Sequence, residues 1–267
     1  MKKILITLAA IMLLVAGCKK QNAQNDVIII GASPTPHAEI LKFAMPYFEK
    51  EGIKVKIYEM NDYIIPNTAL DSNDIQANYM QHEPYLIDFN EKNKLKNKLI
   101  SIGRIHFEPL GIYSGKSNDL KNIKDGAIIG IPSDPTNGAR ALLLLDSLDI
   151  IKINKEKGFQ ATELDITSNP KNIKIRAIEA AQLPVSLPDV DFAVINGNYA
   201  LGAGVLDKLL ISESTDSEAA STYSNIIAVK ENDANNEKLL KIVEIMKSKD
   251  VKDYITSKYK GVVLPVE

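Results

Sequence analysis

Short apolar runs alternate with helix-period segments along this chain, and that alternation limits the fold more than any other feature. Residues 27–32 are a continuous apolar run closed by small side chains, which is typical of a buried parallel strand. Residues 37–50 place apolar side chains on one helical face, with Pro46 as an expected kink, and residues 55–58 alternate like a second strand. The order strand–helix–strand predicts an α/β fold.

The same order begins again at residues 127–131, a strand that ends at Pro132. Residues 134–137 carry the signals of a helix N-terminus, and residues 140–148 continue as an apolar helix. Further strands are expected at residues 191–195 and 226–229, and further helices at residues 237–246 and 251–259.

Two such starts predict two lobes, each a mixed sheet flanked by helices, with a ligand crevice at the carboxyl ends of the strands. The chain should cross between the lobes near residues 108–110 and again near residues 223–225. Lobe 1 would then comprise residues 27–109 and 226–267, and lobe 2 residues 110–225. A single large doubly wound domain is the main alternative.

The first residues direct the chain out of the cytoplasm. Two lysines precede an uncharged run, residues 4–15, which is too short for a membrane-spanning helix of about 20 apolar residues. The run ends in the sequence LVAGC, which resembles the lipobox of bacterial lipoproteins. We expect residues 1–17 to be a signal peptide, Cys18 to carry a lipid anchor, and the polar residues 18–26 to be a flexible tether. The alternative is an ordinary signal peptide that ends beside a cysteine by chance.

Cysteine content and charge narrow the class of protein further. Cys18 is the only cysteine in 267 residues, so a secreted chain of this sequence has no internal disulfide and depends on its core for stability. Removal of residues 1–17 takes two lysines and leaves 30 basic against 34 acidic residues. This acidic balance, without a basic stripe, argues against nucleic acid as a partner. The membrane connection would be the lipid.

Residues 133–140 give the clearest sign of a ligand site. A helix that starts with Pro135 directly after a strand directs free backbone N–H groups at the crevice, with the positive end of the helix dipole behind them. Asn137 lies in the first turn, and Arg140 lies about one turn further in, where it could form a two-pronged pair with a carboxylate. The alternative is a capped helix with Arg140 in a surface salt bridge.

Aromatic side chains flank other predicted strand ends. Tyr63, His82 and Tyr85 suit a ligand with an apolar side chain and a polar head. The alternative for each is a structural role, with the tyrosines as half-buried core residues and the histidine as a residue whose hydrogen bonds are satisfied within the protein.

Asparagines supply the remaining polar candidates. Asn196 and Asn198 follow the strand at residues 191–195, and Asn225 precedes the last predicted strand. An asparagine offers an acceptor to an ammonium and donors to a carboxylate, although after a strand it is often only part of a turn.

The sequence shows no catalytic or metal-binding constellation. His37, His82 and His106 lack metal-site spacing, and no G-x-S-x-G, Walker or G-x-G-x-x-G element occurs. With Cys18 as the anchor, the mature chain has no other thiol for catalysis or for a cysteine-based zinc site. We therefore expect a binding protein without cofactor or metal rather than an enzyme.

Together these stretches resemble the methionine-binding lipoprotein family, the substrate receptors of methionine ABC importers. The resemblance covers nearly the whole chain from the lipobox on, and the shared order of many short segments makes it specific. These segments are residues 61–63, 66–69, 77–82, 84–86, 108–114, 131–137, 140–142, 193–200 and 258–261.

The resemblance implies a two-lobed periplasmic-binding fold that closes around L-methionine or a close analogue. The resemblance implies that Arg140 holds the ligand carboxylate and that Asn225, with Asn196 or Asn198, fixes the amino-acid head. It also implies that Tyr63, His82 and Tyr85 line the side-chain pocket and that His106 or Phe107 lies on the hinge side.

The resemblance also implies a monomer that delivers its ligand to an ABC permease and its ATPase. Gly138 and Ala139 stand where relatives often have a larger polar residue, which leaves D-methionine or a methionine-containing dipeptide as alternative ligands. A lipoprotein enzyme on the same fold and a surface protein with an incidental cleft are the competing hypotheses.

Overall fold

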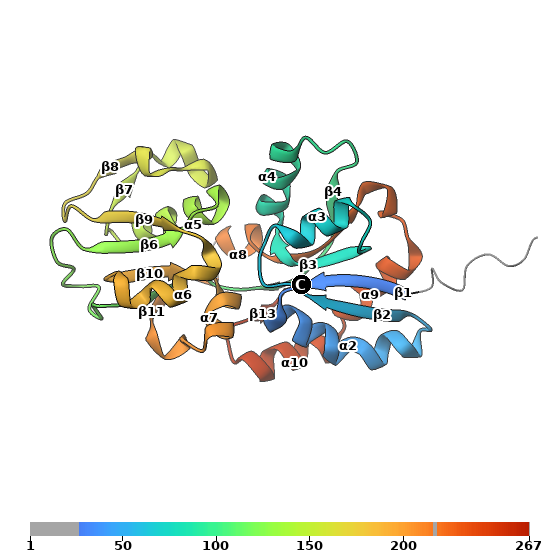
Figure 1. Cartoon of the computed structure of the whole chain (residues 1–267). Helices are drawn as coiled ribbons and strands as arrows, with labels where there is room; N and C mark the ends of the chain where they lie inside the picture. The colour runs from blue at the N-terminus through green and yellow to red at the C-terminus, as the bar shows by residue number, and fades with distance from the viewer. Residues whose placement is uncertain (1–26, 216–217, 267) are drawn as a thin grey trace, which may run out of the picture.

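The computed structural model of the chain describes residues 27–215 and 218–266. The predicted signal peptide, the lipid-anchor residue Cys18 and the tether lie outside the described residues. Two separate sheets form the centres of two lobes, which lie side by side in Figure 1. The predicted two-lobed α/β fold is therefore confirmed, and the single doubly wound domain is excluded. Within the described ranges, no helix has the length and apolar character needed to cross a membrane.

The sheet of lobe 1 has six strands and is mixed. Its strands are β1 (Val27–Ala32), β2 (Lys54–Glu59), β3 (Ala77–His82), β4 (Leu99–Phe107), β12 (Asn225–Lys230) and β13 (Leu264–Pro265), in the order β13-β4-β12-β3-β1-β2. β1 is parallel to β2 and β3, whereas β12 is antiparallel to β3 and β4. Ile30 and Ala32 have no exposed surface, as the apolar run of β1 predicts.

The helices of lobe 1 pack their apolar faces on this sheet. They are α2 (Glu39–Lys50), α3 (Ile65–Asp71), α4 (Glu83–Asn93), α9 (Glu237–Met246) and α10 (Lys249–Tyr259). α2 continues through Pro46, and its buried residues Ile40, Leu41, Ala44 and Phe48 lie on the predicted face. The expected helix start at residue 37 is instead part of a π-helical turn, η1 (Pro34–Ala38), so α2 begins two residues later than predicted.

The sheet of lobe 2 has five strands and is also mixed. Its strands are β5 (Gly111–Ser114), β6 (Ile128–Pro132), β9 (Lys174–Ile178), β10 (Phe192–Ile195) and β11 (Leu209–Ser212), in the order β11-β5-β10-β6-β9. β6 is parallel to β9 and β10, and β5 is antiparallel to β10 and β11. The rest of the lobe comprises α5 (Pro135–Ser147), α6 (Leu183–Ser186), α7 (Gly197–Ala203), α8 (Glu218–Thr222) and a small pair of strands, β7 (Lys152–Ile153) and β8 (Ile166–Ser168).

The chain crosses between the sheets twice. It leaves β4 at Phe107 and enters β5 at Gly111, and it leaves β11 at Ser212 and returns in β12 at Asn225. We propose the division of the lobes into residues 27–109 with 226–267 and residues 110–225, which follows the sheets except that Asn225 already belongs to β12. The carboxyl ends of β3, β6 and β10 lead directly into the residues described next.

Candidate ligand site between the lobes

A narrow cavity lies between the lobes and gathers eight of the ten residues that the sequence indicates for ligand binding. The space in it that a water-sized sphere can enter is ≈ 20 Å³, so the side chains of the two lobes nearly close it. Both lobes and the first crossing contribute to its wall. The lining residues are Tyr63, Met80, Gln81, His82, Tyr85, Glu108, Asn137, Arg140, Asn196, Gly197, Asn198 and Asn225.

The start of α5 is already occupied by a carboxylate of the chain itself. Asp134 is the N-cap residue, and its Oδ1 accepts the backbone N–H of Asn137 at 2.9 Å. The side-chain amide of Asn137 also donates to both oxygens of Asp134, at 3.0 and 3.1 Å. The expectation that free N–H groups of this helix end bind a ligand anion is therefore wrong, because the N-cap carboxylate already accepts from the first turn.

Arg140 lies in the cavity wall with its guanidinium held by Glu213. Its Nε donates to Oε1 at 2.9 Å and its Nη2 to Oε2 at 2.5 Å, while Nη2 also donates to the backbone oxygen of Glu108 at 2.8 Å. The guanidinium carbon lies 4.3 Å from the ring centroid of Tyr223 and 5.6 Å from that of Phe107. Arg140 is 3% exposed, so this ion pair is buried and not a surface salt bridge. Nη1 has no acceptor among the described residues, which leaves its two N–H groups for a ligand.

Glu108 supplies a second charged group to the cavity, and the sequence did not single it out as a site residue. Its Oε1 accepts the Nε2–H of His106 at 2.7 Å, and Nε2 of His37 lies 3.5 Å away. Burial raises the pKa of Glu108, and His37, the backbone N–H of Asn198 and Arg140 oppose that rise. These neighbours favour the charged carboxylate where desolvation disfavours it.

His106 and Phe107 belong to the layer behind the cavity and do not line it. They occupy the last two positions of β4, and the chain turns into the crossing at Glu108, whose side chain reaches the wall instead. His106 is fully buried and contacts Tyr79 and Glu108, and the ring centroid of Phe107 lies 5.6 Å from the guanidinium carbon of Arg140. The prediction that His106 and Phe107 contact the ligand directly is therefore corrected, because they support the residues that line the cavity.

Two hydrogen bonds across the cavity join the lobes. Nε2 of His82 donates to Oδ1 of Asn137 at 3.1 Å, and the hydroxyl of Tyr63 donates to Oδ1 of Asn198 at 2.6 Å. Nδ1 of His82 accepts the backbone N–H of Tyr85 at 3.2 Å and so caps α4, which assigns the proton of the neutral ring to Nε2. Tyr63 and His82, two of the predicted aromatic residues, thus contribute hydrogen bonds between lobe 1 and lobe 2.

The buried histidines predict a loss of stability in acid. Burial is the main cause that lowers the pKa of His37 to about 4 and those of His82 and His106 to about 3, from an ordinary value of 6.5. At a pH below that ordinary value, these histidines bind more protons in the unfolded chain than in the folded one. Their contribution to the free energy of unfolding is therefore complete above that pH and decreases as the pH drops. We expect a fall of about 1 kcal/mol per pH unit for each histidine between roughly pH 6 and 4. The raised pKa of Glu108 acts in the opposite direction.

Denaturant unfolding at about pH 7.5, 6 and 4.5 measures this dependence. The variant His82→Gln, which retains a donor toward Asn137, should have a shallower slope by one histidine's share. A profile that is flat over this range would contradict the prediction.

His37, His106 and Glu108 also have ligand atoms within 4.8 Å of one another, close enough to share one metal ion. Their nitrogens and oxygens are largely used within the protein. His37 Nε2 lies 2.9 Å from Oδ1 of Asn225, His106 Nδ1 contacts the hydroxyl of Tyr79, and His106 Nε2 bonds Glu108. These hydrogen bonds occupy Nε2 of His37 and both nitrogens of His106, whereas Nδ1 of His37 has no partner among the described residues.

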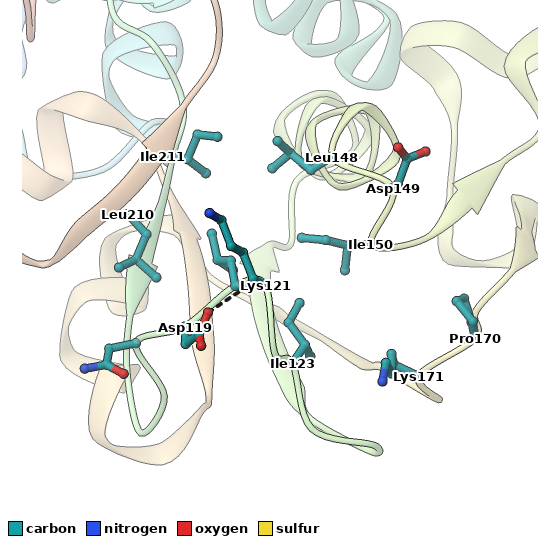
Figure 2. A pocket seen from close by; sticks show the side chains of 12 residues that line it. Asp119, Lys121, Ile123, Leu148, Asp149, Ile150, Pro170, Lys171, Leu210 and Ile211 are labelled. Carbon is teal, nitrogen blue, oxygen red and sulfur yellow. Dashed lines mark hydrogen bonds between the residues drawn. The ribbon is translucent and has the colours of Figure 1, made fainter.

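A second depression lies at the other end of lobe 2. Figure 2 shows its mostly aliphatic wall, in which the charged residues Asp119, Lys121, Asp149 and Lys171 are interspersed, and its volume is ≈ 700 Å³. Ile123 and Lys171 precede β6 and β9, so the depression lies at the opposite ends of these strands from Arg140. It contains none of the residues that the sequence indicates for the ligand.

Comparison with known proteins agrees with this geometry. Residues 28–267 match the family described as NlpA lipoprotein. The chain is similar to the methionine-binding lipoprotein MetQ of Bacillus subtilis (strain 168), with 35% identity over 276 residues covering 100% of this chain and 99% of that protein. It is also similar to the D-methionine-binding lipoprotein MetQ of Salmonella typhimurium, with 36% identity over 255 residues covering 93% of this chain and 92% of that protein.

A solved structure of a nutrient binding protein from Burkholderia cenocepacia bound to methionine superposes with a TM-score of 0.84. The two sequences are 40% identical, and the match covers 90% of this chain and 100% of that one. The resemblance to methionine-binding lipoproteins is confirmed, and the chain belongs to the NlpA lipoprotein family.

Proposed function

We propose that this chain is a lipid-anchored, extracytoplasmic receptor that captures L-methionine or a close analogue and delivers it to an ABC importer. The observation that carries the proposal is the cavity between the lobes, which combines a buried guanidinium, a buried carboxylate and aromatic rings. This set matches the carboxylate, the ammonium and the apolar tail of an amino acid.

Each end of the ligand has a partner in the cavity. Arg140 offers the N–H groups of Nη1 to the ligand carboxylate, and the low dielectric of the closed cleft strengthens that attraction. Glu108 faces the ammonium, together with Oδ1 of Asn196, a buried acceptor that has no donor among the described residues. Tyr63 and Tyr85, whose ring centroids are 5.7 Å apart, would enclose the thioether, at about 0.3–1.5 kcal/mol per sulfur–ring contact.

The names of the relatives support methionine and leave its stereochemistry to experiment. One relative is named for D-methionine, and the Burkholderia cenocepacia protein is described as bound to methionine. Binding without turnover is expected, because the cavity pairs its charged groups with ligand charges and contains no activated nucleophile.

Delivery and attachment follow from the proposed class. Cys18 would carry the lipid that holds the monomer at the membrane, and the closed receptor would dock on a permease whose energy comes from an ATPase on the other side. Hydrogen bonds between the lobes, among them those from Tyr63 and His82, would form as the lobes close.

Isothermal titration with L-methionine, D-methionine and glycyl-methionine tests the proposal. We expect L-methionine to bind with a dissociation constant of about 1 μM or below. Mass spectrometry of the denatured protein should also release methionine that was retained through purification. Absence of binding for all three compounds would exclude the proposed function.

A further inference from the structure

We infer that a buried chain of hydrogen bonds, Tyr79–His106–Glu108, positions the Glu108 carboxylate as the group that recognises the free ammonium of the ligand. Tyr79 and His106 are positioning residues in this arrangement, since neither lines the cavity. The inference rests on the proposed function and names the part of the site that selects amino acids over their deaminated analogues.

The direction of the chain follows from its two ends. Burial holds the pKa of Tyr79 well above its ordinary value, so the phenol keeps its proton and can donate it. His106 is neutral near pH 7 and carries one N–H, because burial lowers its pKa to about 3. If the phenol donates to Nδ1, the single N–H of the ring lies on Nε2, which is 2.7 Å from Oε1 of Glu108. Tyr79 thus selects the tautomer that donates to the carboxylate.

Other groups hold the same carboxylate from further sides. Nε2 of His37 lies 2.9 Å from Oδ1 of Asn225, an acceptor, so this nitrogen bears the proton, and it lies 3.5 Å from Oε1 of Glu108. At Gly197, an added Cβ would lie 2.8 Å from Oε2 of Glu108, so the absence of a side chain makes room for the carboxylate. Glu108 therefore has little freedom to turn away from the cavity.

The Glu108 carboxylate is therefore a rigid acceptor, and neither histidine beside it carries a positive charge. The two imidazoles are neutral, and Arg140 is paired with Glu213, hydrogen-bonds Glu108 only at its backbone oxygen and acts on the carboxyl only through its charge. A ligand ammonium would supply the compensating positive charge. A ligand that lacks it would leave the buried carboxylate hydrogen-bonded but without a contacting positive charge, which is costly.

The test compares two ligands that differ only in the amino group, L-methionine and 4-(methylthio)butanoate. Isothermal titration is performed on the whole mature chain as wild type, His106→Phe, His106→Gln and Tyr79→Phe, with thermal melts to verify folding. His106→Phe should weaken L-methionine binding by about tenfold and change binding of the deaminated analogue by less than about twofold. His106→Gln, whose amide N–H can replace Nε2–H, should restore most of the loss.

Tyr79→Phe provides a milder variant if His106→Phe does not fold, with an expected loss of roughly threefold for L-methionine alone. Equal weakening of both ligands would show a merely structural role and overturn the inference, as would no change for either. Failure of the wild type to bind L-methionine would instead remove the proposed function itself, so the two failures are distinguishable.

Discussion

Replacement of Arg140 by alanine is expected to weaken L-methionine binding by roughly 30-fold or more, because removing one member of a buried charge pair costs about 2–5 kcal/mol. Arg140 is 3% exposed, and Nη1 is the only nitrogen of its guanidinium without an acceptor among the described residues. The ligand carboxylate would complete its set of acceptors. Isothermal titration of wild type and Arg140→Ala, each checked for folding by circular dichroism, measures the effect.

Two controls separate ligand contact from local damage. Arg140→Ala leaves the Glu213 carboxylate buried without its partner, so the double variant with Glu213→Gln removes that penalty. L-Methioninamide, which lacks the carboxylate, should bind weakly and respond little to Arg140→Ala. If the double variant regains wild-type affinity for L-methionine, Arg140 acts only through Glu213 and the assignment is contradicted.

Local sequence patterns predicted most of the fold because the elements involved are locally determined. The apolar run of β1, the helix start at Pro135 and the apolar faces of α2 and α9 all lie within a residue or two of their predicted places. The start of α2 was misplaced because η1 uses the same residues in a wider turn. Periodicity does not distinguish a π-helical turn from the first turn of an α-helix.

The sequence predicted most of the residues that line the candidate site, but it did not predict which charged groups pair with one another there. Side chains placed at strand ends, such as His82 and Asn196, meet in the cavity because the lobes face each other there. Glu213 and Tyr223, by contrast, lie in or beside the irregular second crossing, where no periodicity signals their approach to Arg140. Asp134 shows the same limit, since a Pro-primed helix start looks alike whether its N-cap carboxylate or a ligand accepts from it.

Glu108→Gln is the second variant with a large expected effect, and it should reduce affinity for L-methionine by about 10- to 100-fold. The substitution keeps the size of the side chain, and Oε1 can still accept the Nε2–H of His106. It removes only the negative charge that the ligand ammonium would neutralise in the desolvated cavity. Binding of 4-(methylthio)butanoate should be unchanged or improved, because that anion no longer meets a buried carboxylate.

The matched control is Glu213→Gln, the same chemical change in the buried carboxylate that pairs with Arg140. Glu213 pairs with Arg140 and does not line the cavity, so its neutralisation should affect L-methionine and the deaminated analogue alike. The preference for the amino group would then fall in Glu108→Gln and persist in Glu213→Gln. If both variants lose the preference equally, the net charge of the cleft governs recognition of the ammonium, and the specific role assigned to Glu108 is contradicted. If neither does, the ammonium is recognised by the asparagine side chains alone.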